Sequence, residues 1–208
     1  MRRNEASEVD VGEPSTGGAL LRLSASTSDA ELITRIAEGD RWAQEAFYRR
    51  YVDLVGATAL RLLRHRAEAE DVVQETFLIA FQRLGQLRDS AAVKTWLVRI
   101  AISRSRRRYR WHKLRRMFGA GMETDEAFEQ AAAEGASAED RAELALIDDA
   151  LQRLREPLRT TWLLRHALGL SLAETAEATE CSLSAVKRRL TLAQRHVDRH
   201  VREGGARG

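Results

Sequence analysis

Apolar residues recur at steps of three and four along most of the chain, which is the spacing that places them on one face of an α-helix. The stretch around residue 50 shows it well, with apolar side chains at Trp42, Ala46, Phe47, Tyr51, Leu54 and Val55. Only two prolines occur in 208 residues, Pro14 and Pro157, so few positions would interrupt a long helix. The pattern predicts an all-α protein.

The first half of the chain predicts four helices, at about residues 29–39, 40–65, 67–84 and 91–116. Asp29 and Asp40 stand where N-cap residues are favoured. A polar break at 85–90 separates the third helix from the fourth. Leu97 and Ala101 belong to the inner side of the fourth helix. These helices share enough apolar positions to form one small domain.

A second group of helices begins at Ser137 or Ala138 and predicts a helix-turn-helix near its end. Pro157 suits the first residue of a helix. Ser171 and Glu174 have the spacing of a capping box, which starts a short helix at 171–179. A turn follows, and a longer helix runs from about Leu183 to Val201. Small and apolar residues that would pack the two helices together include Ala173 and Val186.

Charge divides these two groups. Residues 90–122 contain ten Lys or Arg and no acid, whereas residues 123–143 contain eight acids and one base. The basic run predicts a surface for a polyanion, and the acidic run predicts a solvated linker. The expected organisation is two small helical domains joined by a flexible acidic linker, with these boundaries: 1–28 disordered extension, 29–116 first domain, 117–136 linker, 137–201 second domain, 202–208 loose tail.

Three candidate surfaces follow from residue type and spacing. The second helix of the helix-turn-helix would expose side chains that can reach base edges in the major groove: Ser184, Lys187, Arg188, Thr191 and Arg195. The fourth helix interleaves basic residues with aromatic rings. Basic side chains bind phosphates and aromatic rings stack on nucleobases. The residues of this face are Trp96, Arg99, Ser103, Arg106, Arg107 and Arg110. A polar group on the third helix suits a basic protein partner: Asp71, Gln74 and Glu75. Each could instead be an ordinary solvated face.

Several classes of function have no support in the sequence. The single cysteine, Cys181, permits no intrachain disulfide and fits a reducing cytoplasm. His196 and His200 could share a helix face, but a third metal ligand is not evident, so no metal and no cofactor are expected. No apolar run is long enough to span a membrane, and the N-terminus lacks the apolar core of a signal peptide. We therefore expect a cytoplasmic protein that is not an enzyme.

The order of four motifs resembles one known family. Residues 69–77 (AEDVVQETF), 95–101 (TWLVRIA), 170–176 (LSLAETA) and 184–190 (SAVKRRL) together resemble the extracytoplasmic-function (ECF) sigma factors of the sigma-70 family. The resemblance covers about residues 29–199. It implies an alternative sigma factor, which binds core RNA polymerase and directs it to a promoter.

The resemblance assigns a role to each surface. The first domain would be region 2, with Asp71, Gln74 and Glu75 on the polymerase β′ coiled coil and the basic-aromatic face along the −10 element. The loop Leu87 to Lys94 would receive a flipped base. The second domain would be region 4, in which Lys187, Arg188 and Thr191 would read the −35 element and Arg189 and Arg195 would contact phosphates. The β flap of polymerase would be its partner. An anti-sigma factor is a candidate partner as well.

Two departures and three rival readings remain open. Ser103 stands where family members often carry Asn, and Val93 where they often carry an aromatic residue, so base capture could differ. A helix-turn-helix regulator that acts without polymerase would bind duplex DNA unaided. An enzyme acting on nucleic acid would need a metal site or a nucleophile–base pair. A pure interaction module would tolerate neutralisation of Lys187 and Arg188.

Overall fold

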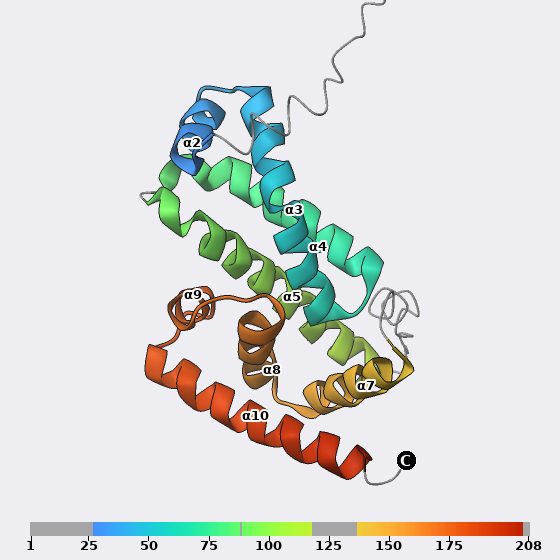
Figure 1. The fold of residues 1–208 in the computed structure, drawn as a ribbon. Coiled ribbons are helices and arrows are strands. Elements are labelled where there is room, and N and C mark those ends of the chain that lie inside the picture. The colour runs from blue at the N-terminus through green and yellow to red at the C-terminus, as the bar shows by residue number, and fades with distance from the viewer. Residues whose placement is uncertain (1–26, 88, 118–136, 206–208) are drawn as a thin grey trace, which may run out of the picture.

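The computed structural model describes residues 27–87, 89–117 and 137–205, and every regular element among them is helical. This confirms the all-α prediction (Figure 1). The α-helices are α2 (Asp29–Ala37), α3 (Arg41–Leu63), α4 (Arg66–Arg83), α5 (Val93–Met117), α7 (Ala138–Arg153), α8 (Glu156–Trp162), α9 (Leu172–Ala178) and α10 (Leu183–Gly205). Short helical turns at Leu84–Gln86, Ser90–Ala92 and Leu163–Ala167 connect them.

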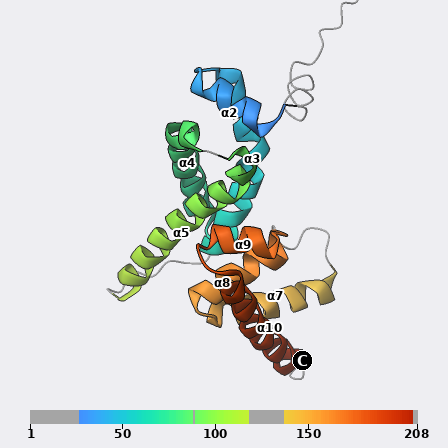
Figure 2. The same ribbon diagram turned by 90° about the vertical axis from the view of Figure 1, so that its left-hand side faces the viewer.

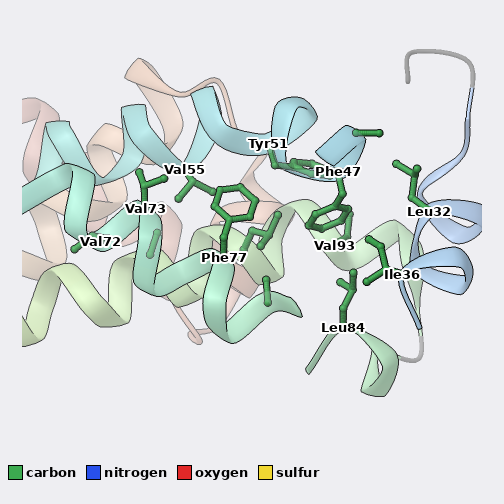
Figure 3. Packing of buried hydrophobic residues seen from close by; sticks show 14 of the residues in the cluster. Leu32, Ile36, Phe47, Tyr51, Val55, Val72, Val73, Phe77, Leu84 and Val93 are labelled. Carbon is green, nitrogen blue, oxygen red and sulfur yellow. The ribbon is translucent and has the colours of Figure 1, made fainter. Parts of the chain in front are cut away.

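Helices α2 to α5 form one unit, which we call the N-terminal bundle (residues 27–117). Helices α3, α4 and α5 pack against one another, and α2 covers one end of α3. Phe47 lies at the centre, close to Phe77 (Figure 3). Its ring lies 6.5 Å from that of Phe77 in an edge-on arrangement and 6.1 Å from that of Phe81. The predicted apolar stripes therefore meet in one core, in which Leu97 and Ala101 are buried.

Side-chain caps start these helices, one of them at a residue other than predicted. Asp40 caps α3 as expected, because its Oδ1 accepts from the backbone N–H groups of Trp42 and Ala43. Ser28, rather than Asp29, caps α2. Asp29 instead accepts hydrogen bonds from Arg50 and from the Tyr51 hydroxyl at 2.6 Å. Burial and the Asp29 carboxylate both raise the pKa of Tyr51.

Helices α7 to α10 form a second unit, the C-terminal bundle (residues 137–205). Helix α10 packs along α7, α8 and α9, and Ala150, Leu151, Leu163 and Val197 are buried between them. The last helix is longer than predicted and continues through Gly205, so residues 202–205 are helical rather than a loose tail. Packing explains the difference, because a Cβ on Gly204 would lie 2.5 Å from Leu146 Cδ2 of α7.

The two bundles touch along α5 (Figures 1 and 2). Val98 and Ile102 of α5 are buried against Leu164, Leu170 and Ala178 of the C-terminal bundle. Helix α10 lies on the side of that bundle away from α5 (Figure 1). The predicted linker, apart from residue 117, lies outside the described residues, as do residues 1–26 and 206–208. None of the described helices is long and apolar enough to cross a membrane.

Candidate nucleic-acid interface

The helix-turn-helix forms through α9, a tight turn and α10. Ser171 Oγ accepts from the Glu174 N–H at 3.1 Å, and the Glu174 carboxylate accepts from the Ser171 N–H at 2.7 Å, which completes the predicted capping box. Glu180 has a positive φ of 51° in the turn. Ser182 Oγ then accepts from the Ala185 N–H at the start of α10. Thr175, Ala178 and Val186 are buried between the helices, whereas Ala173, which was expected there, is exposed.

Helix α10 presents one exposed polar stripe. Five of the six predicted residues on it are exposed, namely Ser184, Lys187, Arg188, Thr191 and Arg195. Their spacing of three and four places them on a single face of α10. Arg189 differs, because it is half-buried and its guanidinium donates to Cys181 Sγ at 3.4 Å. The five exposed side chains form one polar surface on the second helix of the helix-turn-helix.

The predicted basic-aromatic face of α5 is only partly exposed. Ser103, Arg107 and Arg110 are exposed, in a row with i, i+4 and i+7 spacing. Arg106 Nε lies 2.7 Å from Glu156 Oε1, and Arg99 lies 3.8 Å from the Glu180 carboxylate. Trp96 packs against the core of the N-terminal bundle and is half-buried.

The loop ahead of α5 carries Val93 at the position where an aromatic ring could line a pocket for a nucleobase. Asp89 Oδ1 accepts from the Ala91 N–H and so starts the turn Ser90–Ala92. Val93 follows and is 1 % exposed, within the core of the N-terminal bundle. A side chain buried in this way presents no surface to a base. Residue 88, inside the predicted loop, lies outside the described residues.

The three polar residues predicted on α4 adjoin an unexpected arginine. Asp71 and Gln74 are exposed and Glu75 is half-buried. Arg108 of α5 reaches across and donates to Asp71 Oδ2 at 2.9 Å and to Glu75 Oε1 at 2.6 Å. Hydrogen bonds to Glu75, Glu68 and Asp71 outweigh partial burial and raise the pKa of Arg108. Sequence reasoning missed Glu68 and Arg108, although Glu68, Asp71 and Glu75 have the spacing of one helix face.

Apolar side chains extend this part of the surface. Leu78 of α4 is 62 % exposed, and Tyr48 of α3 is 40 % exposed with its ring centroid 4.6 Å from that of Phe77. Leu78 follows Gln74 by four positions, so the two share a face of α4. Exposed apolar patches with a polar rim mark sites of protein interaction. The sequence does hint at the exposure of Leu78, because this residue falls outside the apolar stripe of its helix.

A metal site has no support among the described residues. No group of three or more His, Cys, Asp or Glu side chains there could hold a metal ion. The rings of His196 and His200 stack with centroids 6.4 Å apart, and His200 Nε2 lies 2.7 Å from Asp149 Oδ2. A hydrogen bond from Arg153, together with His200, lowers the pKa of Asp149. His200 thereby joins α10 to α7.

Comparison with known proteins finds two family models in order along the chain. Residues 47–115 match sigma-70 region 2 and residues 144–197 match sigma-70 region 4. The chain is 30 % identical to the RNA polymerase sigma-H factor of Pseudomonas aeruginosa over 179 residues, which cover 82 % of this chain and 92 % of that protein. It is 29 % identical to the ECF RNA polymerase sigma-E factor of Escherichia coli K12, covering 86 % and 97 %.

Solved structures agree on the fold. The structure of CnrH in complex with the cytosolic domain of CnrY superimposes with a TM-score of 0.60 and 24 % identity, covering 83 % of this chain and 96 % of that chain. The sigma factor RpoE in complex with the anti-sigma factor NepR from Bartonella quintana also gives 0.60, with 21 % identity and coverage of 76 % and 96 %.

Proposed function

The chain belongs to the sigma-70 family, in its ECF group, and from this premise we propose which of its surfaces carries each step of transcription initiation. Its function is that of an alternative sigma factor that directs transcription initiation by RNA polymerase. RNA polymerase acts in the cytoplasm, so we place the protein there too. We propose that residues 29–116 form the region 2 domain and residues 137–201 form the region 4 domain.

The observation that carries the proposal is the exposed stripe of α10. Ser184, Lys187 and Arg188 lie in the first two turns of the second helix of a helix-turn-helix, and all three are exposed. Side chains at such positions reach base edges, and Lys and Arg donate to the acceptors of guanine. We assign this stripe, with Thr191 and Arg195, to the −35 element. Arg189 donates to Cys181 Sγ in the turn before α10, and we assign to it only a contact with a DNA phosphate.

The exposed row on α5 is assigned to the −10 element. Ser103, Arg107 and Arg110 contact its backbone and bases, and Arg99 and Arg106 join them once their carboxylate partners are displaced. Trp96 supports the row from the edge of the core rather than stacking on a base. Since Val93 is buried, base capture in the 87–94 loop rests on its polar groups.

The polymerase-binding surface is assigned to α4 and the adjoining part of α3. Asp71, Gln74 and Glu75 supply polar contacts for the β′ coiled coil, and Leu78 and Tyr48 supply apolar area. Arg108 holds Asp71 and Glu75 in place, so a basic partner would meet carboxylates that are already ordered. The β flap is the partner proposed for the C-terminal bundle.

An anti-sigma factor is the remaining proposed partner. CnrH and RpoE, which share this fold, were solved in complex with CnrY and with the anti-sigma factor NepR. The exposed apolar side chains of this chain, Leu78 and Leu192 among them, would offer such a partner area to bury.

The test is transcription in vitro from genomic fragments, with purified core polymerase and with or without this protein. The proposal expects start sites that appear only when the protein is present. Those starts should weaken at least tenfold with the Lys187→Ala/Arg188→Ala variant. Absence of new start sites, together with tight binding of duplex DNA by the protein alone, would instead favour a regulator that acts without polymerase.

A further inference from the structure

A small cavity lies where α8 meets α5 and the end of α3. About 10 Å³ of it is open to the centre of a water-sized sphere, which is room for a single small occupant. Its lining comes from separate segments of the chain, so no one motif in the sequence encodes it. The polar residues of the lining are Ser105, Arg106 and Tyr109 of α5 and Glu156, Arg159 and Thr160 of α8.

Two buried polar groups in this lining have no hydrogen-bond partner within the part of the chain that the structure describes. They are the Nε–H of Arg159 and the hydroxyl of Ser105, and their residues are 4 % and 2 % exposed. A buried polar group without a partner costs free energy, because it has lost its contacts with water. The Arg159 Nε–H can only donate, and the Ser105 hydroxyl can donate as well. One acceptor in the cavity would therefore satisfy both groups.

The charge of Arg159 also lacks a balancing carboxylate. Its Nη1 donates to Gln152 Oε1 at 3.1 Å, and its guanidinium lies 5.0 Å from the centroid of the Tyr109 ring. Both contacts stabilise a cation, but neither supplies a full negative charge. Within residues 27–87, 89–117 and 137–205, Arg159 forms no ion pair. Buried charges in proteins are normally paired with an opposite charge, so this guanidinium favours an anion beside it.

Glu156, the one carboxylate among the described residues of the lining, already has other partners. Its Oε1 accepts from Arg106 Nε at 2.7 Å and from Thr160 Oγ1 at 3.0 Å. Arg106 and Arg159 bring two positive charges to the lining and Glu156 brings one negative charge, which leaves an excess of one positive charge. A water molecule would accept from the two unpartnered donors without balancing this charge. A monovalent anion would do both.

We propose that this cavity binds one monovalent, monatomic anion of the size of chloride. Arg159 Nε–H and Ser105 O–H donate to the anion, and the Arg106 guanidinium adds positive charge beside it. The bound anion thereby bridges α5 and α8. A sulfate or phosphate ion exceeds this space and would bring further negative charge toward Glu156. The proposal goes beyond the function proposed above, and neither of its tests involves DNA or polymerase.

Binding is tested by chloride-35 nuclear magnetic resonance with the full chain in sodium chloride. A chloride ion that exchanges with a protein site tumbles slowly while it is bound, so its resonance broadens. Arg159→Met and Ser105→Ala each remove one of the two donors. Arg199→Met removes the same charge as Arg159→Met from an exposed position on α10, and it is the matched control. Circular dichroism would verify that each variant is folded.

The proposal expects the wild-type protein and Arg199→Met to broaden the chloride resonance by similar amounts. Arg159→Met and Ser105→Ala should each lose at least half of this broadening. Ser105→Ala preserves the test if loss of the buried Arg159 guanidinium unfolds the protein. Equal broadening by the wild type and by a folded Ser105→Ala variant would overturn the proposal, because the two donors would then hold only water.

Thermal unfolding supplies an independent readout. Sodium gluconate is exchanged for sodium chloride at constant ionic strength, so that screening of surface charges is unchanged. A ligand that binds only the folded state raises the midpoint of unfolding. The wild-type midpoint should therefore rise by at least about 2 °C more than that of Ser105→Ala. Sodium sulfate at the same ionic strength should not produce this difference. An equal rise in the two proteins with chloride, or the same difference with sulfate, would overturn the assignment of a monatomic anion.

Discussion

Arg108 shows how much of a surface is decided by single residues of a neighbouring helix. The α4 carboxylates at Asp71 and Glu75 would repel each other on an isolated helix face, but the guanidinium of Arg108 lies between them. Hydrogen bonds to charged groups are among the stronger ones in proteins. The contact therefore both stabilises the α4–α5 packing and orders the proposed polymerase-binding surface.

Replacement of Arg108 by Ala is expected to destabilise the protein. The change leaves Glu68, Asp71 and Glu75 without this partner, and we expect a loss of about 1–2 kcal/mol in the free energy of unfolding. Urea denaturation of the full chain measures it. Arg107→Ala, at an exposed neighbouring position, is the matched control and should change stability by less than about 0.5 kcal/mol. Equal effects would show that the three contacts contribute nothing.

The pKa of Glu174 reports on contact between the bundles. Hydrogen bonds from Lys94 and from Ser171 lower it from 4.5 to about 2. Since the folded pKa is depressed, the stabilisation is fully present above pH 4.5 and is lost as the pH falls through about 2. Lys94→Ala should raise the pKa toward its ordinary value, and Lys94→Arg should keep it low. Carboxyl-carbon NMR titration measures it, and an unchanged pKa in Lys94→Ala would assign the whole shift to Ser171.

For single residues, the sequence predicts the exposure of side chains well where a helix faces solvent. Lys187, Arg188 and Thr191 are exposed as expected. It fails where a distant segment supplies the partner, since Glu156 lies 50 residues from Arg106 in sequence. Trp96 is half-buried, because a large ring at the edge of an apolar stripe packs against the core.

At the scale of elements, local chemistry sets where helices begin. The capping box at Ser171 and the N-cap at Asp40 were predictable, because each depends on residues within three positions. The extension of α10 past Val201 was not, because Gly204 is helical where it packs closely against Leu146 of α7. Capping residues therefore predicted these two starts, whereas the end of α10 depends on packing.

Ser171→Ala is the direct test of the α9 cap. It removes the Oγ that accepts from the Glu174 N–H, and we expect a loss of about 1 kcal/mol in the free energy of unfolding. Ser103→Ala, at an exposed position inside α5, is the control and should be neutral or slightly stabilising. Thermal and urea unfolding would measure both variants. A neutral Ser171→Ala would mean that packing of Thr175 and Ala178 alone fixes α9.

At the scale of the whole molecule, the order of elements could be predicted and their docking could not. Alternating charge blocks and helix periodicity indicate two helical units and a basic α5. The seam of Val98 and Ile102 against Leu170 depends on which of several apolar faces meet, and no local pattern specifies that choice. The docking matters for function because it brings acidic residues of the C-terminal bundle into contact with basic residues of α5.

The central claim is a division of labour, in which α10 recognises the −35 element and α5 opens the −10 element. The most direct measurement is permanganate footprinting at a start site mapped with the wild-type protein, combined with a gel shift of the same polymerase–promoter complex. Ser103→Ala/Arg107→Ala should keep the shifted complex but lose reactive thymines near the start site. Lys187→Ala/Arg188→Ala should lose the complex itself. Intact opening by the α5 variant, or unchanged binding by the α10 variant, would contradict the account.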